Sequence, residues 1–189
     1  RGCAQECRYT PGCKNRKKIK TPQGEKKRGK AMGKLKMVRV DYRMVHGQIV
    51  AKWIKFRPVD RLILADDSLV DDPFMGDIYR MAVPDREVDI VKLGDIQTAI
   101  DRKDDTVLLI FKDVASAYTV YKNGLQLPEL NVGAVQNSAQ RKSVVQGVAL
   151  SAEEYEKLCE MKAEGVNVFL QPIPENDPVS LGSIEKKLK

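Results

Sequence analysis

The sequence is short of the residues that build metal centres and membrane spans. It has a single histidine, His46, and four cysteines, of which only Cys159 lies beyond residue 13. A structural zinc site needs about four Cys or His ligands at suitable spacing, so we expect no bound metal. No apolar run approaches the ~20 residues that cross a bilayer, and the first residues lack the apolar centre of a signal peptide. We therefore expect a cytoplasmic protein with reduced cysteines.

Two motifs of common α/β enzymes are also missing. No Gly-x-Gly-x-x-Gly follows the first expected strand, which disfavours a dinucleotide enzyme. No Gly-x-Ser-x-Gly elbow is present, which disfavours a serine hydrolase. Residues 24–31 approach the phosphate-binding loop pattern, but Ala31 stands where a Ser or Thr would hold Mg²⁺ and no strand precedes it. We interpret this as a chance match in a segment rich in Lys and Gly.

Positive charge is concentrated in residues 1–36. This segment holds 13 of the 33 Lys and Arg residues and only two acids, so residues 37–189 are mildly acidic although the whole chain carries +7. It has almost no large apolar residues, and such a segment cannot offset the entropy of ordering. We expect residues 1–36 to be a disordered basic tail of upstream or added sequence, with Met37, or as a second choice Met32, as the natural start.

The basic tail supports an alternative from a different class, a non-catalytic protein that binds nucleic acid through it. Lys and Arg attract phosphates without regard to base sequence. Tyr9 is the only aromatic residue in the segment that could stack on bases, and we expect no nucleic-acid partner. Deletion of the tail separates the two hypotheses, because only the nucleic-acid hypothesis requires all activity to vanish.

From residue 37 onward, short apolar runs alternate with segments of helical periodicity. The runs predict strands at 37–40, 61–66, 87–93, 106–111, 130–135, 143–150 and 166–170. The periodic segments predict helices at 48–56, 71–83, 95–102, 113–121, 151–164 and 177–188. This order predicts one α/β domain over residues 37–189. We expect a mainly parallel central sheet of about six or seven strands, with room for an antiparallel edge, and helices on both faces. The most apolar run, 106–111, is expected at the centre.

Polar residues and glycines predict where several helices begin and end. Asp113 opens one helix, and Gly124 stands just past its end. Ser151 begins a capping box for the helix at 151–164. Asp95 could cap the helix at 95–102, and Pro178 is expected in the first turn of the last helix.

His46 lies on the loop between the first expected strand and the helix that follows. Ligands of parallel sheets bind beyond the carboxyl ends of the strands, and backbone amides at a helix start hold phosphate. Arg43 can pair with a phosphate, and Gly47 lets a phosphate approach the backbone. Asp41 either caps the loop or accepts an imidazole N–H, which leaves the other nitrogen free to attack phosphorus.

These residues also carry a family resemblance. The order Asp-x-Arg-x-x-His-Gly-Gln-Ile over residues 41–49 resembles the phosphorylation-site loop of the enzyme IIB components of the mannose/fructose/sorbose family of the bacterial sugar phosphotransferase system (PTS). Residues 130–133, Leu-Asn-Val-Gly, and the acids Asp66 and Asp67 are similar to further family segments. The resemblance covers residues 37–189. Tyr42 departs from it, because the family commonly has a second acid there.

The resemblance implies a phosphoryl relay. His46 would accept a phosphoryl group at Nδ1 from a phosphohistidine on the IIA partner and pass it to a hexose held by the membrane components IIC and IID, at the inner face of the membrane. No cofactor is needed, and a homo-oligomer is allowed. The implied site consists of catalytic His46, Asp41 and Arg43, phosphate-binding Gly47 and Gln48, and secondary loops with Asp66, Asn131 and Gly133. Arg39, Lys52 and Lys112 could form a positive rim for an acidic partner; the alternative is that they are ordinary solvated residues of the surface.

Overall fold

The computed structural model describes residues 34–188 of the chain. The predicted basic tail, residues 1–36, lies outside these residues except for its last three. Those three open strand β1 (Lys34–Asp41), which begins before Met37, the residue at which we expected the domain to start. Lys34 pairs with Thr106 of a neighbouring strand. Residues 34–36 are therefore part of the central sheet.

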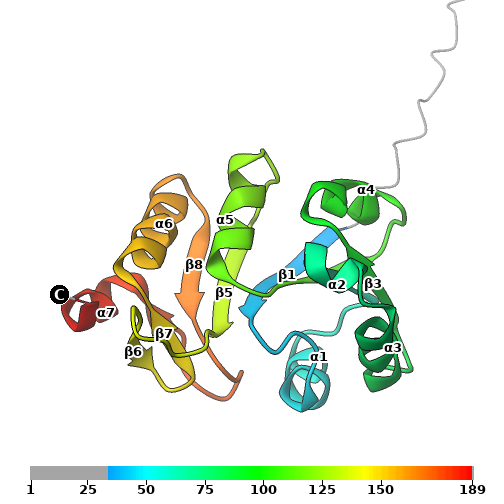
Figure 1. The fold of residues 1–189 in the computed structure, drawn as a ribbon, viewed down its shortest axis with the longest axis horizontal. Coiled ribbons are helices and arrows are strands. Elements are labelled where there is room, and N and C mark those ends of the chain that lie inside the picture. The colour runs from blue at the N-terminus through cyan, green and yellow to red at the C-terminus, as the bar shows by residue number, and fades with distance from the viewer. Residues whose placement is uncertain (1–33, 189) are drawn as a thin grey trace, which may run out of the picture.

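Seven strands form one mainly parallel sheet in the order β3-β2-β4-β1-β5-β8-β9 (Figure 1). The other strands of this sheet are β2 (Arg61–Ala65), β3 (Glu87–Val91), β4 (Thr106–Phe111), β5 (Glu129–Ala134), β8 (Asn167–Leu170) and β9 (Val179–Ser180). Only β9, at the edge, runs antiparallel to its neighbour. The predicted α/β class with a mainly parallel sheet is confirmed. β4 lies one place from the centre we expected for it, because β1 pairs with both β4 and β5 and takes the middle position.

Helices cover both faces of the sheet, as predicted. One face carries the π-helix η1 (Ile49–Trp53), its continuation α1 (Ile54–Phe56) and α3 (Pro73–Ala82); the other carries α4 (Ile96–Asp101), α5 (Val114–Lys122), α6 (Ala152–Ala163) and α7 (Leu181–Leu188). Alternate side chains of a strand point to opposite faces. In β4, Leu108 and Ile110 pack under the first group of helices, and Leu109 and Phe111 under the second. Figure 1 shows α5 and α6 side by side, away from α1 and α3.

The predicted helix ends are largely confirmed. The Asp113 side chain accepts the Ser116 amide at the start of α5, and Ser151 and Glu154 form both bonds of the capping box at the start of α6. Gly124, just past α5, has φ +99°, a conformation that glycine adopts without steric cost.

Within residues 34–188, no helix combines the length and apolar character needed to cross a membrane.

Three local predictions are wrong. Asp95 makes no side-chain capping bond, because it lies in a 3₁₀ turn, η2 (Leu93–Asp95), that leads into α4. The last helix begins at Leu181 and not near Pro178, because residues 179–180 pair with β8 as a strand. The extended segment 143–150 is a hairpin of two antiparallel strands, β6 (Lys142–Val145) and β7 (Val148–Leu150), which turns at Gly147 with φ +81°.

Candidate active site

The chain folds back after β1, and this turn brings His46 over the end of the strand. The amide of Met44 donates to the carbonyl of Asp41 at 2.9 Å. Met44 has φ +56°, and it is the only non-glycine residue among the described ones with a positive φ. This conformation costs about 1–2 kcal/mol. The Met44 side chain is buried in a cluster with Ile49 and Trp53, and this packing holds the loop in its strained shape.

Asp41 lies at the centre of the site, and its side chain is fully buried. Its Oδ2 atom accepts a hydrogen bond from Nη2 of Arg39 at 2.9 Å and lies 3.0 Å from Nε2 of His46. Its Oδ1 atom accepts bonds from Nε and the backbone amide of Arg43 at 3.1 and 3.2 Å. Burial acts to raise the pKa of Asp41, but the bond from His46 and the two arginines outweigh it and lower the pKa to about 2. Asp41 is therefore ionised at neutral pH.

The partners of the imidazole determine which of its nitrogens carries the proton. An ionised carboxylate only accepts, so the Nε2 atom of His46 must donate to Asp41. The backbone amide of Gln48 donates to Nδ1 of His46 at 3.3 Å, which requires a lone pair on Nδ1. This arrangement selects the neutral Nε2–H tautomer, with the nucleophilic lone pair on Nδ1. The imidazole is part-buried, with 18% of the side chain exposed.

His46 stands immediately before a helix, as predicted, and the helical conformation begins at Gly47. The amides of Ile49 and Val50 both bond to the carbonyl of His46. The first amides of a helix have no acceptor within it, so the amide of Gly47 can donate to an anion beside Nδ1, and that of Gln48 can do so if it gives up its long bond to Nδ1. Gly47 is exposed, and a Cβ added there would meet nothing within 4 Å. The approach to its backbone is open.

Arg39 was expected on a positive rim, but its side chain is fully buried. Nη1 donates to the carbonyl of Gln171 and Nη2 to the carbonyl of Pro172, both at 3.0 Å. Its guanidinium lies 4.9 Å from the centre of the Trp53 ring. The sequence signal for this role was the spacing of Arg39 and Asp41, because residues two apart on a strand share a face.

Gly133 lies in β5 against this buried arginine. The pairing of β1 with β5 runs from Val40 opposite Val132 to Asp41 opposite Ala134, so Gly133 is the extra residue of a bulge. A Cβ added to Gly133 would lie 1.9 to 2.2 Å from three guanidinium atoms of Arg39. Glycine is required here because the guanidinium occupies the space of a side chain.

Two further predicted site residues lie away from the imidazole. Asn131 is fully buried inside β5, opposite Arg39, and neither polar atom of its side chain has a hydrogen-bond partner among residues 34–188. Asn131 and Gly133 thus form part of the sheet under the site and not a loop. Asp66 caps the short helix α2 (Asp67–Val70) and pairs with Lys112 at 3.1 Å. Lys52 pairs with Glu175 at 2.9 Å. The charges of both lysines expected on the rim are therefore balanced by neighbouring acids.

A cavity of about 280 Å³ opens beside the loop, where Arg43 and Gln48 form one wall. The opposite wall comes from the turn of the β6–β7 hairpin, with Gln146, and from the segment after β8, with Pro172 and Asn176. Sequence reasoning missed this wall, because its parts lie about 100 residues or more from His46 and carry no motif. The fold alone brings them to the site.

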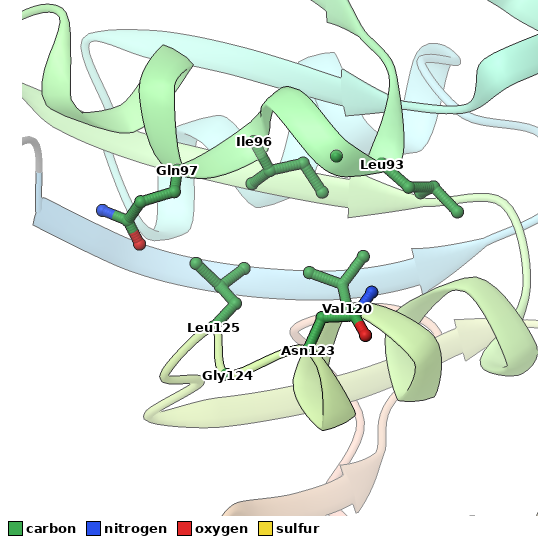
Figure 2. Close-up of a pocket in the computed structure, with 8 residues that line it drawn as sticks. Leu93, Ile96, Gln97, Val120, Asn123, Gly124 and Leu125 are labelled. Atoms are coloured by element: carbon green, nitrogen blue, oxygen red, sulfur yellow. The ribbon is translucent and has the colours of Figure 1, made fainter.

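A second cavity, of about 190 Å³, lies between α4 and α5 (Figure 2). Figure 2 shows Leu93, Ile96, Val120 and Leu125 around it, with Gln97 at one end. None of its lining residues is an acid, a base or a nucleophile. This cavity therefore offers no side chain suited to acid–base or nucleophilic catalysis.

Known proteins are similar to this chain in both sequence and fold. The family model described as "PTS system sorbose subfamily IIB component" matches residues 35–189. The N-acetylgalactosamine-specific phosphotransferase enzyme IIB component 2 of Escherichia coli K12 is 26% identical over 155 residues, which are 79% of this chain and 98% of that protein.

Two solved structures extend the comparison. The structure of manxB from Thermoanaerobacter tengcongensis is 33% identical, with a TM-score of 0.77 over 83% of this chain and 98% of that one. The IIBSor domain of the sorbose permease from Klebsiella pneumoniae, 24% identical, has the same fold, with a TM-score of 0.74 over 81% and 97% of the two chains. The chain therefore belongs to the sorbose subfamily of IIB components of the phosphotransferase system.

Proposed function

We propose that this protein is a phosphocarrier in which Nδ1 of His46 accepts a phosphoryl group from the phosphohistidine of a IIA protein. It then transfers the group to a hexose held by the membrane components IIC and IID. Membership of the IIB family supports a phosphotransferase role in general. The observation that supports His46 as the carrier is its bond to Asp41, which leaves a lone pair on Nδ1 beside the first amides of a helix.

The reaction consists of two in-line displacements at phosphorus. In the first, the Nδ1 lone pair attacks phosphorus while the donor N–P bond breaks, and its electron pair returns to the donor imidazole. In the second, a sugar hydroxyl oxygen attacks, the Nδ1–P bond breaks with its electrons returning to His46, and the hydroxyl proton passes to a base or water at the sugar site. Such transfers depend mainly on positioning and charge stabilisation.

The surrounding groups have distinct tasks in this scheme. A phosphorylated imidazole that keeps its Nε2 proton is cationic, and the Asp41 carboxylate at 3.0 Å stabilises that charge. The Gln48 amide, 3.3 Å from Nδ1, exchanges this weak bond for one to a phosphoryl oxygen. Arg43 is 35% exposed, and its guanidinium can neutralise the incoming phosphoryl group.

The test is to incubate the protein with phosphorylated IIA and to follow an acid-labile, base-stable phosphoryl label. We expect the parent to be labelled and His46→Ala to remain unlabelled. Gln97→Ala, in the cavity between α4 and α5, is the control and should be labelled at the parental rate. Equal labelling of His46→Ala and the parent would refute the proposal.

A further inference from the structure

Arg39 is a buried cation that contacts the same carboxylate as His46. We infer that Arg39 is a positioning residue for phosphoryl transfer: it orients the Asp41 carboxylate and balances its charge, and Gly133 supplies the space it needs. In consequence His46 keeps its proton on Nε2 and its lone pair on Nδ1. This inference rests on the proposed transfer at His46.

The hydrogen bonds of Arg39 explain how the carboxylate is oriented. Nε and Nη2 both face Oδ2 of Asp41, at 3.3 and 2.9 Å. Two further N–H groups of the guanidinium donate to the carbonyls of Gln171 and Pro172. Trp53 donates its indole N–H to the carbonyl of Pro172 at 3.1 Å. A planar guanidinium held at both ends can fix a carboxylate in direction, which a single ammonium charge cannot do.

The charges around His46 explain why an arginine is needed. Among the described residues, Asp41 contacts the imidazole directly, and Arg39 and Arg43 both pair with Asp41. Arg43 is partly exposed, so solvent weakens its effect on Asp41. Without Arg39, the buried carboxylate would favour a proton on both imidazole nitrogens, and an imidazolium has no lone pair for attack on phosphorus.

Gly133 offers a way to test this without changing a charged residue. The Cβ of an alanine would lie 1.9 Å from Cζ of Arg39, which is far inside van der Waals contact. Either the guanidinium or the bulge of β5 must move. Gly133→Ala should therefore reproduce the effects of Arg39→Met while Arg39, Asp41 and His46 are all still present.

The experiment measures the initial rate of labelling by phosphorylated IIA from pH 5 to 9, and the imidazole ¹⁵N shifts of His46. We expect Arg39→Met and Gly133→Ala to be labelled at least tenfold more slowly at pH 7, with the acid limb of the rate profile moved to higher pH. The labelling rate of Arg39→Lys should lie between the rates of these two variants and that of the parent, because lysine keeps the positive charge but loses the planar contact with the carboxylate.

Arg61 provides a matched control, since it is also almost fully buried and pairs with Asp89 and Asp105. It lies at the start of β2, at the opposite end of the sheet. Arg61→Met should keep the parental pH profile. The parent should show the Nε2–H tautomer at pH 8, and an Nδ1–H tautomer would overturn the inference even if both variants failed to fold.

Parental rates and pH profiles in folded Arg39→Met and Gly133→Ala would overturn it as well. That outcome would leave the proposed function intact as long as His46→Ala stayed unlabelled. Labelling of His46→Ala would instead refute the proposed function itself, so the two failures are distinguishable.

Discussion

Oδ2 of Asp41 lies 3.0 Å from Nε2 of His46, which is five positions further along the chain and beyond the turn at Met44, where φ is +56°. Together with the Gln48 amide at Nδ1, this contact selects the tautomer of the only histidine in the sequence, with the proton on Nε2 and the lone pair on Nδ1. The same oxygen accepts a hydrogen bond from the buried Arg39 guanidinium, so the imidazole and the arginine share one carboxylate oxygen.

The first prediction concerns the charge of Asp41. Asp41→Asn keeps the shape of the side chain but no longer stabilises a cationic phosphoimidazole, and we expect labelling by phosphorylated IIA to slow by about 100-fold. Asp113→Asn, which alters the cap of α5, is the control. A rate within twofold of the parent in folded Asp41→Asn would contradict the role given to the carboxylate.

The second prediction concerns stability in acid. The pKa of Asp41 is about 2 in the folded protein against an ordinary 3.8, so folding favours the ionised carboxylate. Its contribution, about 2 kcal/mol at 1.36 kcal/mol per pKa unit, is complete above pH 4 and is lost as pH falls towards 2. Urea denaturation at pH 2 to 5 should show this decline in the parent and a shallower one in Asp41→Asn. If the unfolding free energies of the parent and of Asp41→Asn declined in parallel with pH, ionisation of Asp41 would not contribute to the acid sensitivity.

The third prediction concerns the strained turn. Replacement of Met44, which is 2% exposed, by a small residue should cost about 2–5 kcal/mol of unfolding free energy. Because φ is +56°, Met44→Ala should be less stable than Met44→Gly by about 1 kcal/mol, the reverse of the usual order. Denaturant midpoints measure the difference. Met44→Ala as the more stable variant would show that the turn relaxes.

The fourth prediction compares two truncations. Removal of residues 1–33 leaves β1 intact and should change neither labelling nor stability, whereas removal of 1–36 deletes the first three residues of β1. The longer truncation also removes the Lys36 carbonyl that accepts Arg57. It should lower the denaturation midpoint. Loss of all labelling on removal of 1–33 would favour the alternative hypothesis based on the basic segment.

Much of the fold followed from local patterns. The apolar runs predicted the parallel strands, and short-range bonds such as the capping box of Ser151 and Glu154 appear as expected. The errors came where pairing partners decide the conformation. Residues 179–180 form a strand because β8 offers an open edge, and the hairpin at Gly147 depends on a turn that apolar spacing does not report.

The sequence by itself determined the loop chemistry, because Asp41, Arg43 and His46 lie within six residues and a single turn can join them. Only the tertiary structure decided the surroundings of that loop. It buried Arg39 against Gln171 and Pro172, placed Gly133 where the guanidinium needs space, and closed a cavity with segments from the C-terminal third. The reason is physical: burial and close approach arise from strand order, which residues distant in the chain settle together.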